Sequence, residues 1–304
     1  MRVEERAVTT RSRRERWIHM ALFGAAAFSV LTSAAIIALL AMESVAFLRT
    51  PGVSVTGFLF GLEWNPLAQA DKKFGVVPLV GGTVLVAGVS ALVSIPFGLL
   101  TAVYLSEYAP RAVRSVVKPV LEVLAGIPTV VYGFFAVTVL TPALRDVIPG
   151  IHSFNALSAG IAVGVMCLPI VCSLSEDALR AVPRSLREGA HALGGTRFDV
   201  TMRVVVPAAL SGVMAAFLLA IARAVGETMI VALAAGAKPT LTLNPGESVQ
   251  TMTAYIVAVI KGETPAGSIE RKSVHAVGAL LFLMTLSITI IGNRILRRFR
   301  EVYE

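Results

Sequence analysis

Six long runs of uncharged, mostly apolar residues set the pattern of hydrophobic and polar positions along the chain. Each run has at least 19 residues, enough for a helix to cross about 30 Å of hydrocarbon. The second run, 74–106, is too long for one straight crossing, and Pro78, Gly81 and Gly82 indicate that its helix begins near residue 80. The pattern predicts an all-α integral membrane protein with six transmembrane helices, at about residues 20–42, 80–104, 123–144, 156–176, 207–235 and 273–295.

The composition also favours a membrane protein. Of the 304 residues, 56% are hydrophobic and 15% are charged, and the mean hydropathy is +0.77. Soluble proteins carry about 25% charged residues and do not bury this much apolar surface. The composition therefore excludes a disordered chain and argues against an ordinary soluble enzyme.

The distribution of Lys and Arg predicts the orientation. Eighteen of the 27 basic residues lie in the two terminal segments and in the loops after the second and fourth helices, whereas the opposite side carries eight. Because positive charge marks cytoplasmic loops, both termini are predicted to lie in the cytoplasm. The net charge of +8 is then explained by these cytoplasmic segments and does not indicate nucleic-acid binding. The predicted organisation is a basic tail (1–19), a six-helix domain (20–296) and a short tail (297–304).

The first helix is expected to remain in the protein. Its run of 23 uncharged residues is longer than the apolar core of a signal peptide. Glu43 and Phe47 follow it, where a cleavage site would need small residues.

Two outer segments are distinctive. The segment 50–73 contains Glu63-Trp64-Asn65-Pro66, in which we expect Trp64 to be an interfacial anchor. The segment 248–260 has 13 uncharged residues and is too short to span. We expect it to form a re-entrant or interfacial helix.

The cytoplasmic loop 181–207 has a predicted shape of its own. Pro183 and the apolar residues after it, at helical spacing, predict a short helix. Gly194 suits a tight turn, and Thr196 is a candidate N-cap for a second short helix. Pro207 then stands where the fifth membrane helix begins.

This loop resembles the coupling loop of ABC-transporter permeases. The consensus of that family is Glu-Ala-Ala, three residues, Gly, nine residues, Ile, one residue and Leu-Pro. The matching positions here are Glu188, Gly189, Ala190, Gly194, Val204, Val206 and Pro207. The departures are Gly189 for the middle Ala, and Val204 and Val206 for Ile and Leu. The resemblance implies docking on a separate ATPase, with Glu188 as a polar contact and Gly194 at the bend; the alternative is an amphipathic loop lying on headgroups.

The chain carries no signal of its own for metal, cofactor or ATP binding. No Gly-x-x-x-x-Gly-Lys-Ser/Thr stretch is present, so we expect ATP and Mg to bind a partner ATPase and this chain to be no enzyme. The four His do not cluster, so we propose no metal site. Cys167 and Cys172 lie in an apolar run and are expected to be buried thiols.

Arg223 and Glu227 are ionisable residues inside the fifth predicted helix. Arg223 comes 16 residues after Pro207, about 24 Å along a helix, where a charge costs roughly 3 kcal/mol on insertion scales. One interpretation is a buried ion pair that fixes helix packing. The other is an anion station, in which Arg223 binds a tetrahedral oxyanion while Glu227, four residues on, holds the guanidinium and accepts a proton-bearing oxygen.

The stretch Gly126-Ile127-Pro128 lies in the third predicted helix. Proline in a span frees a carbonyl and permits a kink, so Gly126 and Pro128 form a candidate hinge or a bundle-packing feature. Tyr132 is either a path-lining residue or an interface aromatic.

Three stretches, the coupling loop among them, make the chain similar to the phosphate-specific ABC permeases, the PstC and PstA family. They are Glu122 to Gly133, the coupling loop, and Ala222-Arg223-Ala-Val-Gly-Glu227-Thr228-Met229. Glu63-Trp64-Asn65-Pro66 resembles the PstC type specifically. The resemblance spans roughly residues 55 to 295. The loop between the third and fourth helices is shorter than in some relatives.

The resemblance implies a type I-like ABC importer permease in a bacterial or archaeal cytoplasmic membrane. Its implied partners are a second, PstA-like permease, a PstB-like ATPase dimer and a PstS-like extracytoplasmic phosphate-binding protein. Arg223, Glu227 and Thr228 would then line the phosphate path. The residues alone indicate only an anion, and phosphate comes from the resemblance.

Two rival functions stay open at this level. The first is an ABC permease for another oxyanion, namely sulfate, molybdate or a phosphonate. The second is a membrane scaffold or sensor that transports nothing and whose basic segments bind lipid or a signalling partner. A self-powered secondary transporter is disfavoured because only one span carries ionisable residues near mid-membrane.

Overall fold

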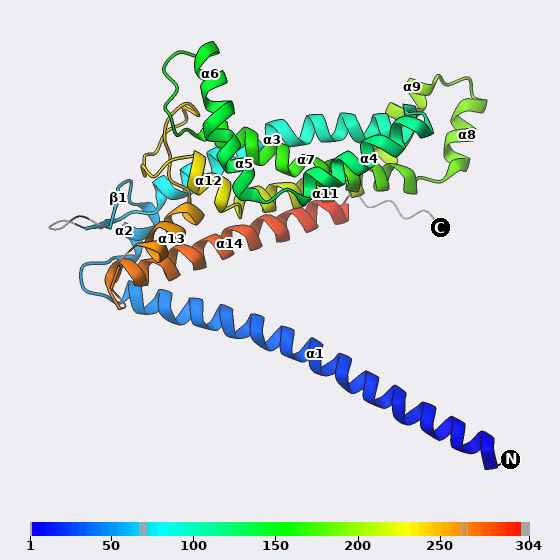
Figure 1. Ribbon diagram of the computed structural model, residues 1–304, viewed down its shortest axis with the longest axis horizontal. Coiled ribbons are helices and arrows are strands. Elements are labelled where there is room, and N and C mark those ends of the chain that lie inside the picture. The colour runs from blue at the N-terminus through cyan, green and yellow to red at the C-terminus, as the bar shows by residue number, and fades with distance from the viewer. Residues whose placement is uncertain (1, 67, 69–71, 263, 266, 299–304) are drawn as a thin grey trace.

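The computed structural model is almost entirely helical and describes residues 2–66, 68, 72–262, 264–265 and 267–298 (Figure 1). Three π-helical segments, η1 to η3, continue α-helices without a break. The elements, in chain order, are α1 (Arg2–Leu48), α2 (Val55–Phe60), β1 (Trp64–Asn65), β2 (Lys73–Phe74), α3 (Val77–Val103), η1 (Tyr104–Tyr108), α4 (Arg111–Gly126), α5 (Thr129–Phe135), η2 (Ala136–Leu140), α6 (Thr141–Val147), α7 (Ala156–Ala181), α8 (Arg184–Ala192), α9 (Arg197–Val200), η3 (Thr201–Val205), α10 (Val206–Ala208), α11 (Leu210–Val225), α12 (Met229–Ala234), α13 (Met252–Lys261) and α14 (Ile269–Arg298).

Among the described residues, five helices are long and apolar enough to cross a membrane, and six if one bent pair counts as a single span. The five are Glu15–Leu48, Val77–Tyr108, Thr129–Val147, Ala156–Ala181 and Ile269–Leu296. The bent pair is Arg197–Ala208 with Leu210–Val225, which meet at 68°. The predicted class, an all-helical membrane protein with about six spans, is confirmed.

The third membrane helix begins later than predicted. Ile127 is extended (φ −68°, ψ 129°), because proline disfavours the α conformation in the residue before it. The helix is therefore interrupted between α4 and α5, and the membrane helix begins at Thr129 instead of residue 123. Residues 111–126 form the separate amphipathic helix α4.

The fifth membrane helix is interrupted. The sequence predicted one helix over residues 207–235, but α11 ends at Val225 and α12 begins at Met229. Residues 226–228 between them are not helical.

α3 and α7 form the centre of the bundle and pack at very short range. A Cβ added to Gly160 would lie 2.5 Å from Val89 Cβ, and one added to Gly164 would lie 2.8 Å from Val93 Cβ. Small residues allow such close approach, the usual means of packing helices in lipid. A cluster of small apolar residues from α7 and α11 completes this core.

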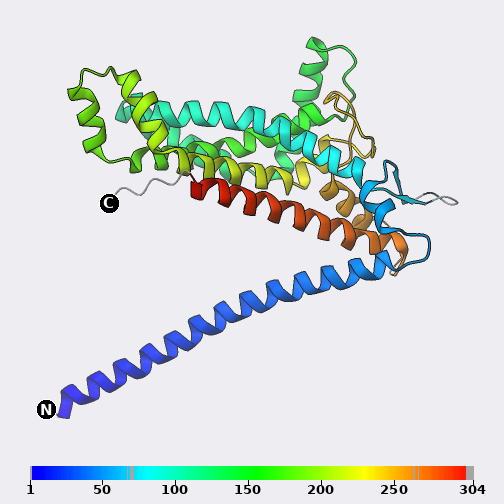
Figure 2. The ribbon, with the colours of Figure 1, turned by 180° about the vertical axis from the view of Figure 1, so that it is seen from behind.

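α1 contacts α14 and then leaves the bundle at an angle, as Figures 1 and 2 both show. Its apolar side chains are largely exposed, including Phe23, Phe28 and Leu31. α1 begins and α14 ends at the end of the molecule where α8 and α9 lie (Figure 1), as the charge distribution predicted for two cytoplasmic termini.

The opposite end, which the charge distribution predicts to be the outer one, carries a small aromatic core. β1 and β2 pair antiparallel, with Trp64 opposite Phe74. Trp64 is 3% exposed and packs edge-on against Tyr255 of α13, with ring centroids 4.9 Å apart. Trp64 is thus a core residue at this end of the bundle, and the expected interfacial anchor is wrong. The ten-residue helix α13 (Met252–Lys261) confirms a short, non-spanning helix at the predicted segment 248–260, which it overruns by one residue.

Candidate functional site

The interruption between α11 and α12 is built by Glu227. The Oε1 atom of Glu227 accepts hydrogen bonds from the backbone amides of Met229 (3.0 Å) and Ile230 (3.3 Å), the first N–H groups of α12. A carboxylate at a helix N-terminus satisfies unpaired donors and complements the helix dipole. The hydroxyl of Thr253, in the first turn of α13, donates to the Glu227 carbonyl at 2.7 Å. The break is therefore held by both its own carboxylate and the outer helix.

Arg223 lies in the last turn of α11, just before this break. Its side chain is exposed, and no hydrogen bond or ion pair of Arg223 is found within the described part of the chain. It shares one exposed helix face with Ala215 and Leu219. Arg223 lies about 24 Å along the predicted fifth membrane helix, near the middle of the membrane. An unpartnered guanidinium there cannot lie against lipid without a cost of about 3 kcal/mol or more. This face of α11 must therefore meet another protein surface or water.

The predicted pairing of Arg223 with Glu227 is not what the structure shows. A continuous helix would have placed both side chains on one face, but the helix is broken between them and Glu227 turns to cap α12. Glu227 is 8% exposed, whereas Arg223 is exposed. The two groups share a site without forming an ion pair across the described residues. Thr228, half-buried, donates to the Gly226 carbonyl at 3.2 Å.

α5 packs against α12. Each of these two helices begins directly after an interruption in a membrane helix. A Cβ at Gly133 would lie 3.1 Å from the Ile230 Cα, which shows how closely they approach. The hydroxyl of Tyr132 donates to the Leu124 carbonyl at 2.7 Å and so joins α5 to the end of α4. Tyr132 is buried, and its hydrogen bond connects the two helices on either side of the interruption at residues 126–128.

The coupling-loop region has the predicted helix–turn–helix shape. α8 ends before Gly194, whose φ of +85° needs a residue without a Cβ. Thr196 caps α9, since its hydroxyl oxygen accepts from the Asp199 amide at 3.2 Å. Glu188 and Gly189 are exposed on α8, and Ala190 packs inward. Pro207 lies in α10, before the 68° bend.

Two apolar side chains project from this loop. Leu193 is 92% exposed and Phe198 is 62% exposed. Leu193 follows α8 and Phe198 lies in α9, so the two flank the Gly194 turn. Large apolar side chains beside a polar helix are typical anchors of a protein–protein contact.

α8 is joined to the bundle by an ion pair. Arg187 binds both carboxylate oxygens of Glu107 in η1, at 2.6 and 2.7 Å, and also donates to the Leu179 carbonyl at 2.7 Å. The pair is largely buried, with side chains 21% and 10% exposed. The end of α3 and the end of α7 are thus both tied to α8.

A second charge cluster joins α4 to α7. Glu176 is 1% exposed and accepts ion pairs from Arg114 (2.8 Å), Lys118 (2.9 Å) and Arg180 (3.6 Å). The sequence interpretation used these basic residues only for orientation and missed both carboxylates. The available signal was their position, since Glu107 and Glu176 each end an apolar run on the basic side.

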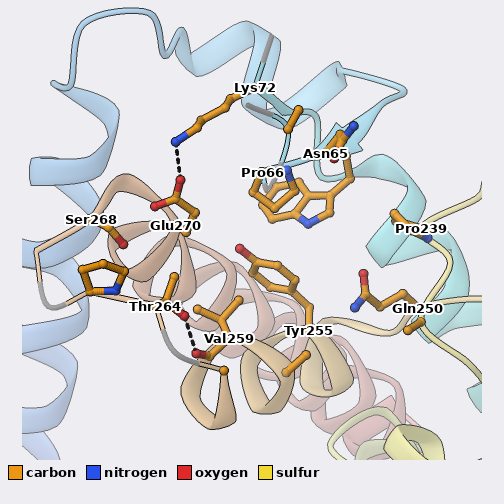
Figure 3. Close-up of a pocket in the computed structure, with 16 residues that line it drawn as sticks. Asn65, Pro66, Lys72, Pro239, Gln250, Tyr255, Val259, Thr264, Ser268 and Glu270 are labelled. Atoms are coloured by element: carbon orange, nitrogen blue, oxygen red, sulfur yellow. Dashed lines mark hydrogen bonds and ion pairs between the residues drawn. The ribbon is translucent and has the colours of Figure 1, made fainter. Parts of the chain in front are cut away.

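The outer end contains a pocket of about 900 Å³ between the β1–β2 region, α13 and the start of α14 (Figure 3). In Figure 3 the Gln250 carboxamide points into it, while the ion pair of Lys72 with Glu270 borders it on another side. Trp64 and Tyr255 line it as well. The pocket lies at the opposite end of the bundle from α8.

Cys167 and Cys172 are free and buried, as predicted. Cys167 faces α11, with its Sγ 3.8 Å from the Ala220 carbonyl. The described residues contain no group of three or more His, Cys, Asp or Glu arranged to hold a metal ion.

Comparison with known proteins gives a consistent family. Residues 94–301 match the family of binding-protein-dependent transport system inner membrane components. The probable ABC transporter permease protein YqgH of Bacillus subtilis is 36% identical over 94% of this chain and 93% of its own length. The phosphate transport system permease protein PstC of Mesorhizobium japonicum is 31% identical over 97% of both chains.

Solved structures share the fold. A chain of a bacterial alginate ABC transporter, in complex with its alginate pentasaccharide-bound periplasmic protein, matches with a TM-score of 0.67 at 16% identity, over 96% of this chain and 98% of the other. A chain of the inward-facing MetNI methionine ABC transporter matches with a TM-score of 0.58 at 21% identity, over 74% and 96%. At this identity the likeness concerns the fold alone.

Proposed function

The chain belongs to the family of binding-protein-dependent transport system inner membrane components, and we propose that it is the permease subunit of an ATP-driven importer of inorganic phosphate. It is a multi-pass ABC permease of the PstC type, and such an importer permease works with an ATPase and a binding protein. The proposed specific partners are a PstA-like permease, a PstB-like ATPase dimer that binds ATP and Mg, and a PstS-like phosphate-binding protein. The proposed location is a bacterial or archaeal cytoplasmic membrane.

The observation that carries this proposal is the unpartnered Arg223 beside an interrupted membrane helix. In secondary transporters, interrupted helices place helix ends and unwound backbone at the substrate site. The exposed face of α11 that carries Arg223 would meet the second permease, so the guanidinium would line the path between the two subunits. Its planar fork of donors matches the oxygens of a tetrahedral anion.

Glu227 supplies a reason to favour phosphate. Its Oε1 is occupied by two amides of α12, and Oε2 accepts no hydrogen bond within the described part of the chain. A carboxylate oxygen accepts a hydrogen bond from the P–OH of hydrogen phosphate, whereas sulfate has no such proton to donate. Thr228 contributes a hydroxyl at the same break.

The coupling loop would transmit the ATPase motion. The binding protein docks on the outer face, ATP closes the two ATPase subunits, and α8 moves with the ATPase on which it docks. Because Arg187 ties α8 to the ends of α3 and α7, this movement reaches the central helices directly. The path then opens alternately to the two sides.

The experiment is an uptake assay with labelled phosphate in cells that lack their own high-affinity phosphate system. The chain is co-expressed with its permease, ATPase and binding-protein partners, and sulfate, molybdate or a phosphonate is added in 100-fold excess. Phosphate uptake that persists against each competitor supports the proposal. Uptake abolished by one of them assigns the cargo to that oxyanion, and a complex that assembles with an ATPase argues against a scaffold.

A further inference from the structure

A small polar pocket lies on the cytoplasmic side, where η1, the end of α7 and the start of α8 meet. It encloses about 350 Å³ and is lined by Ser106, Arg180, Val182, Arg184 and Arg187. Three guanidinium groups from two helices thus surround one cavity. No carboxylate is among the described residues that line it.

The positive charge around this pocket exceeds the negative charge that neutralises it. Four cationic side chains pair with two carboxylates: Arg114, Lys118 and Arg180 with Glu176, and Arg187 with Glu107. Arg187 satisfies Glu107, to which Ser106 also donates at 2.8 Å. Arg180 is the most distant of three cations around Glu176. Arg184 has no ion pair or hydrogen bond within the described ranges, and its side chain is exposed.

The pocket lies at the depth of lipid headgroups. About 20 helical residues cross the hydrocarbon core, whereas Ala156–Ala181 has 26 residues and Val77–Tyr108 has 32. Arg180 and Ser106 stand within the last residues of these helices, at the end that carries α8. They therefore extend beyond the hydrocarbon into the polar zone, open to both lipid headgroups and cytoplasm.

We propose that this pocket binds a phosphate group, supplied either by an anionic phospholipid headgroup or by inorganic phosphate of the cytoplasm. Arginine forks bind phosphate oxygens by paired, charge-assisted hydrogen bonds, and basic pockets between helices on the cytoplasmic side suit anionic headgroups. Since Arg187 lines the pocket and also holds Glu107, the bound group touches the link between α8 and α3. The proposal does not rest on phosphate being the transported ion.

The test compares three forms of the assembled complex of permease and ATPase chains, purified in detergent: wild type, Arg184→Gln and Arg111→Gln. Arg111 is the matched control, because it is also an exposed arginine on the cytoplasmic side but does not line the pocket. One arm adds phosphatidylglycerol or phosphatidylcholine and measures the bound lipid by native mass spectrometry. The other measures labelled inorganic phosphate by equilibrium dialysis.

The expected result is at least a tenfold weaker affinity of Arg184→Gln for one ligand, with Arg111→Gln within twofold of wild type. A loss for phosphatidylglycerol, with phosphatidylcholine unaffected, identifies the headgroup source, and a loss for inorganic phosphate identifies the free ion. A second variant, Arg184→Lys, keeps the charge without the fork and is expected to fall between wild type and Arg184→Gln. If Arg184→Gln assembles normally and matches Arg111→Gln in both arms, the proposal is overturned.

Discussion

One guanidinium nitrogen of Arg187 donates to both carboxylate oxygens of Glu107, at 2.6 and 2.7 Å. The two residues are 80 positions apart and belong to α8 and to the π-helical end of α3. Because the pair is largely buried, breaking it destabilises the protein more than breaking a surface ion pair would. It makes α8 part of the membrane bundle instead of a loosely attached loop.

Breaking this pair is expected to uncouple ATP hydrolysis from transport. In the assembled complex, Glu107→Gln should leave ATP hydrolysis within about twofold of wild type and lower phosphate uptake roughly tenfold. The tenfold figure corresponds to a loss of about 1.4 kcal/mol of coupling free energy when the ion pair is removed. The measurement is the ratio of ATP hydrolysed to phosphate imported in proteoliposomes. Glu63→Gln is the control, because Glu63 pairs with Lys73 in an exposed contact on the outer side. An unchanged ratio in Glu107→Gln would remove the pair from the coupling route.

Glu176 is expected to be a major stabilising residue. The substitution Glu176→Gln leaves Arg114 and Lys118 beside a buried neutral amide and should destabilise the folded permease by about 2–4 kcal/mol. Thermal unfolding of the purified complex measures this loss. Glu122→Gln, on the exposed face of α4, should change the midpoint little. Equal midpoints for the two variants would show that the cluster contributes nothing.

Gly194 and Gly189 should respond differently to alanine. Gly194 has a φ of +85°, so Gly194→Ala should strain the turn by about 1–2 kcal/mol. Gly189 lies inside α8 with nothing within 4 Å of an added Cβ, and Gly189→Ala should be neutral or stabilise α8 by up to about 1 kcal/mol. The measurement is the amount of ATPase that co-purifies with a tagged form of each permease variant. A Gly189→Ala variant that loses the ATPase as strongly as Gly194→Ala would contradict this account.

Leu193 is expected to be an anchor for the ATPase. Truncating a buried interface anchor costs about 1–2 kcal/mol or more, so Leu193→Ala should weaken ATPase binding tenfold or more. The measurement is the dissociation constant of the ATPase for permease in nanodiscs. Leu243, 91% exposed at the opposite end, supplies the control Leu243→Ala, which should bind as wild type. Similar dissociation constants for both variants would place the docking surface elsewhere.

The sequence predicted much of this structure because its strongest signals are local. Long apolar runs, the glycine turn at Gly194 and the Thr196 cap depend on neighbouring residues and hardly on tertiary contacts. The coupling-loop spacing predicted α8 and α9 in the correct order. The break at Pro128 had a local signal too, but hydropathy alone extended the third helix backwards across it.

The interrupted fifth helix depended on contacts that the sequence pattern does not display. Arg223 and Glu227 stand four residues apart, which favours a shared face on an intact helix. The Thr253 hydroxyl and the free amides of α12 instead fix Glu227 at a break. The Thr253 contact, 26 positions away, comes from three-dimensional packing, as does the contact of Arg187 with Glu107. The two amides lie within three residues of Glu227 and are local contacts.

Uptake by the Arg223→Gln variant tests the central claim most directly. The variant and wild type are co-expressed with their partners in cells without another high-affinity phosphate system, at matched membrane levels and with matched recovery of the ATPase. The account predicts that the variant assembles normally and imports phosphate at least a hundredfold more slowly, since about 3 kcal/mol of lost anion stabilisation corresponds to such a factor. Normal phosphate uptake by assembled Arg223→Gln would show that Arg223 does not belong to the ion path.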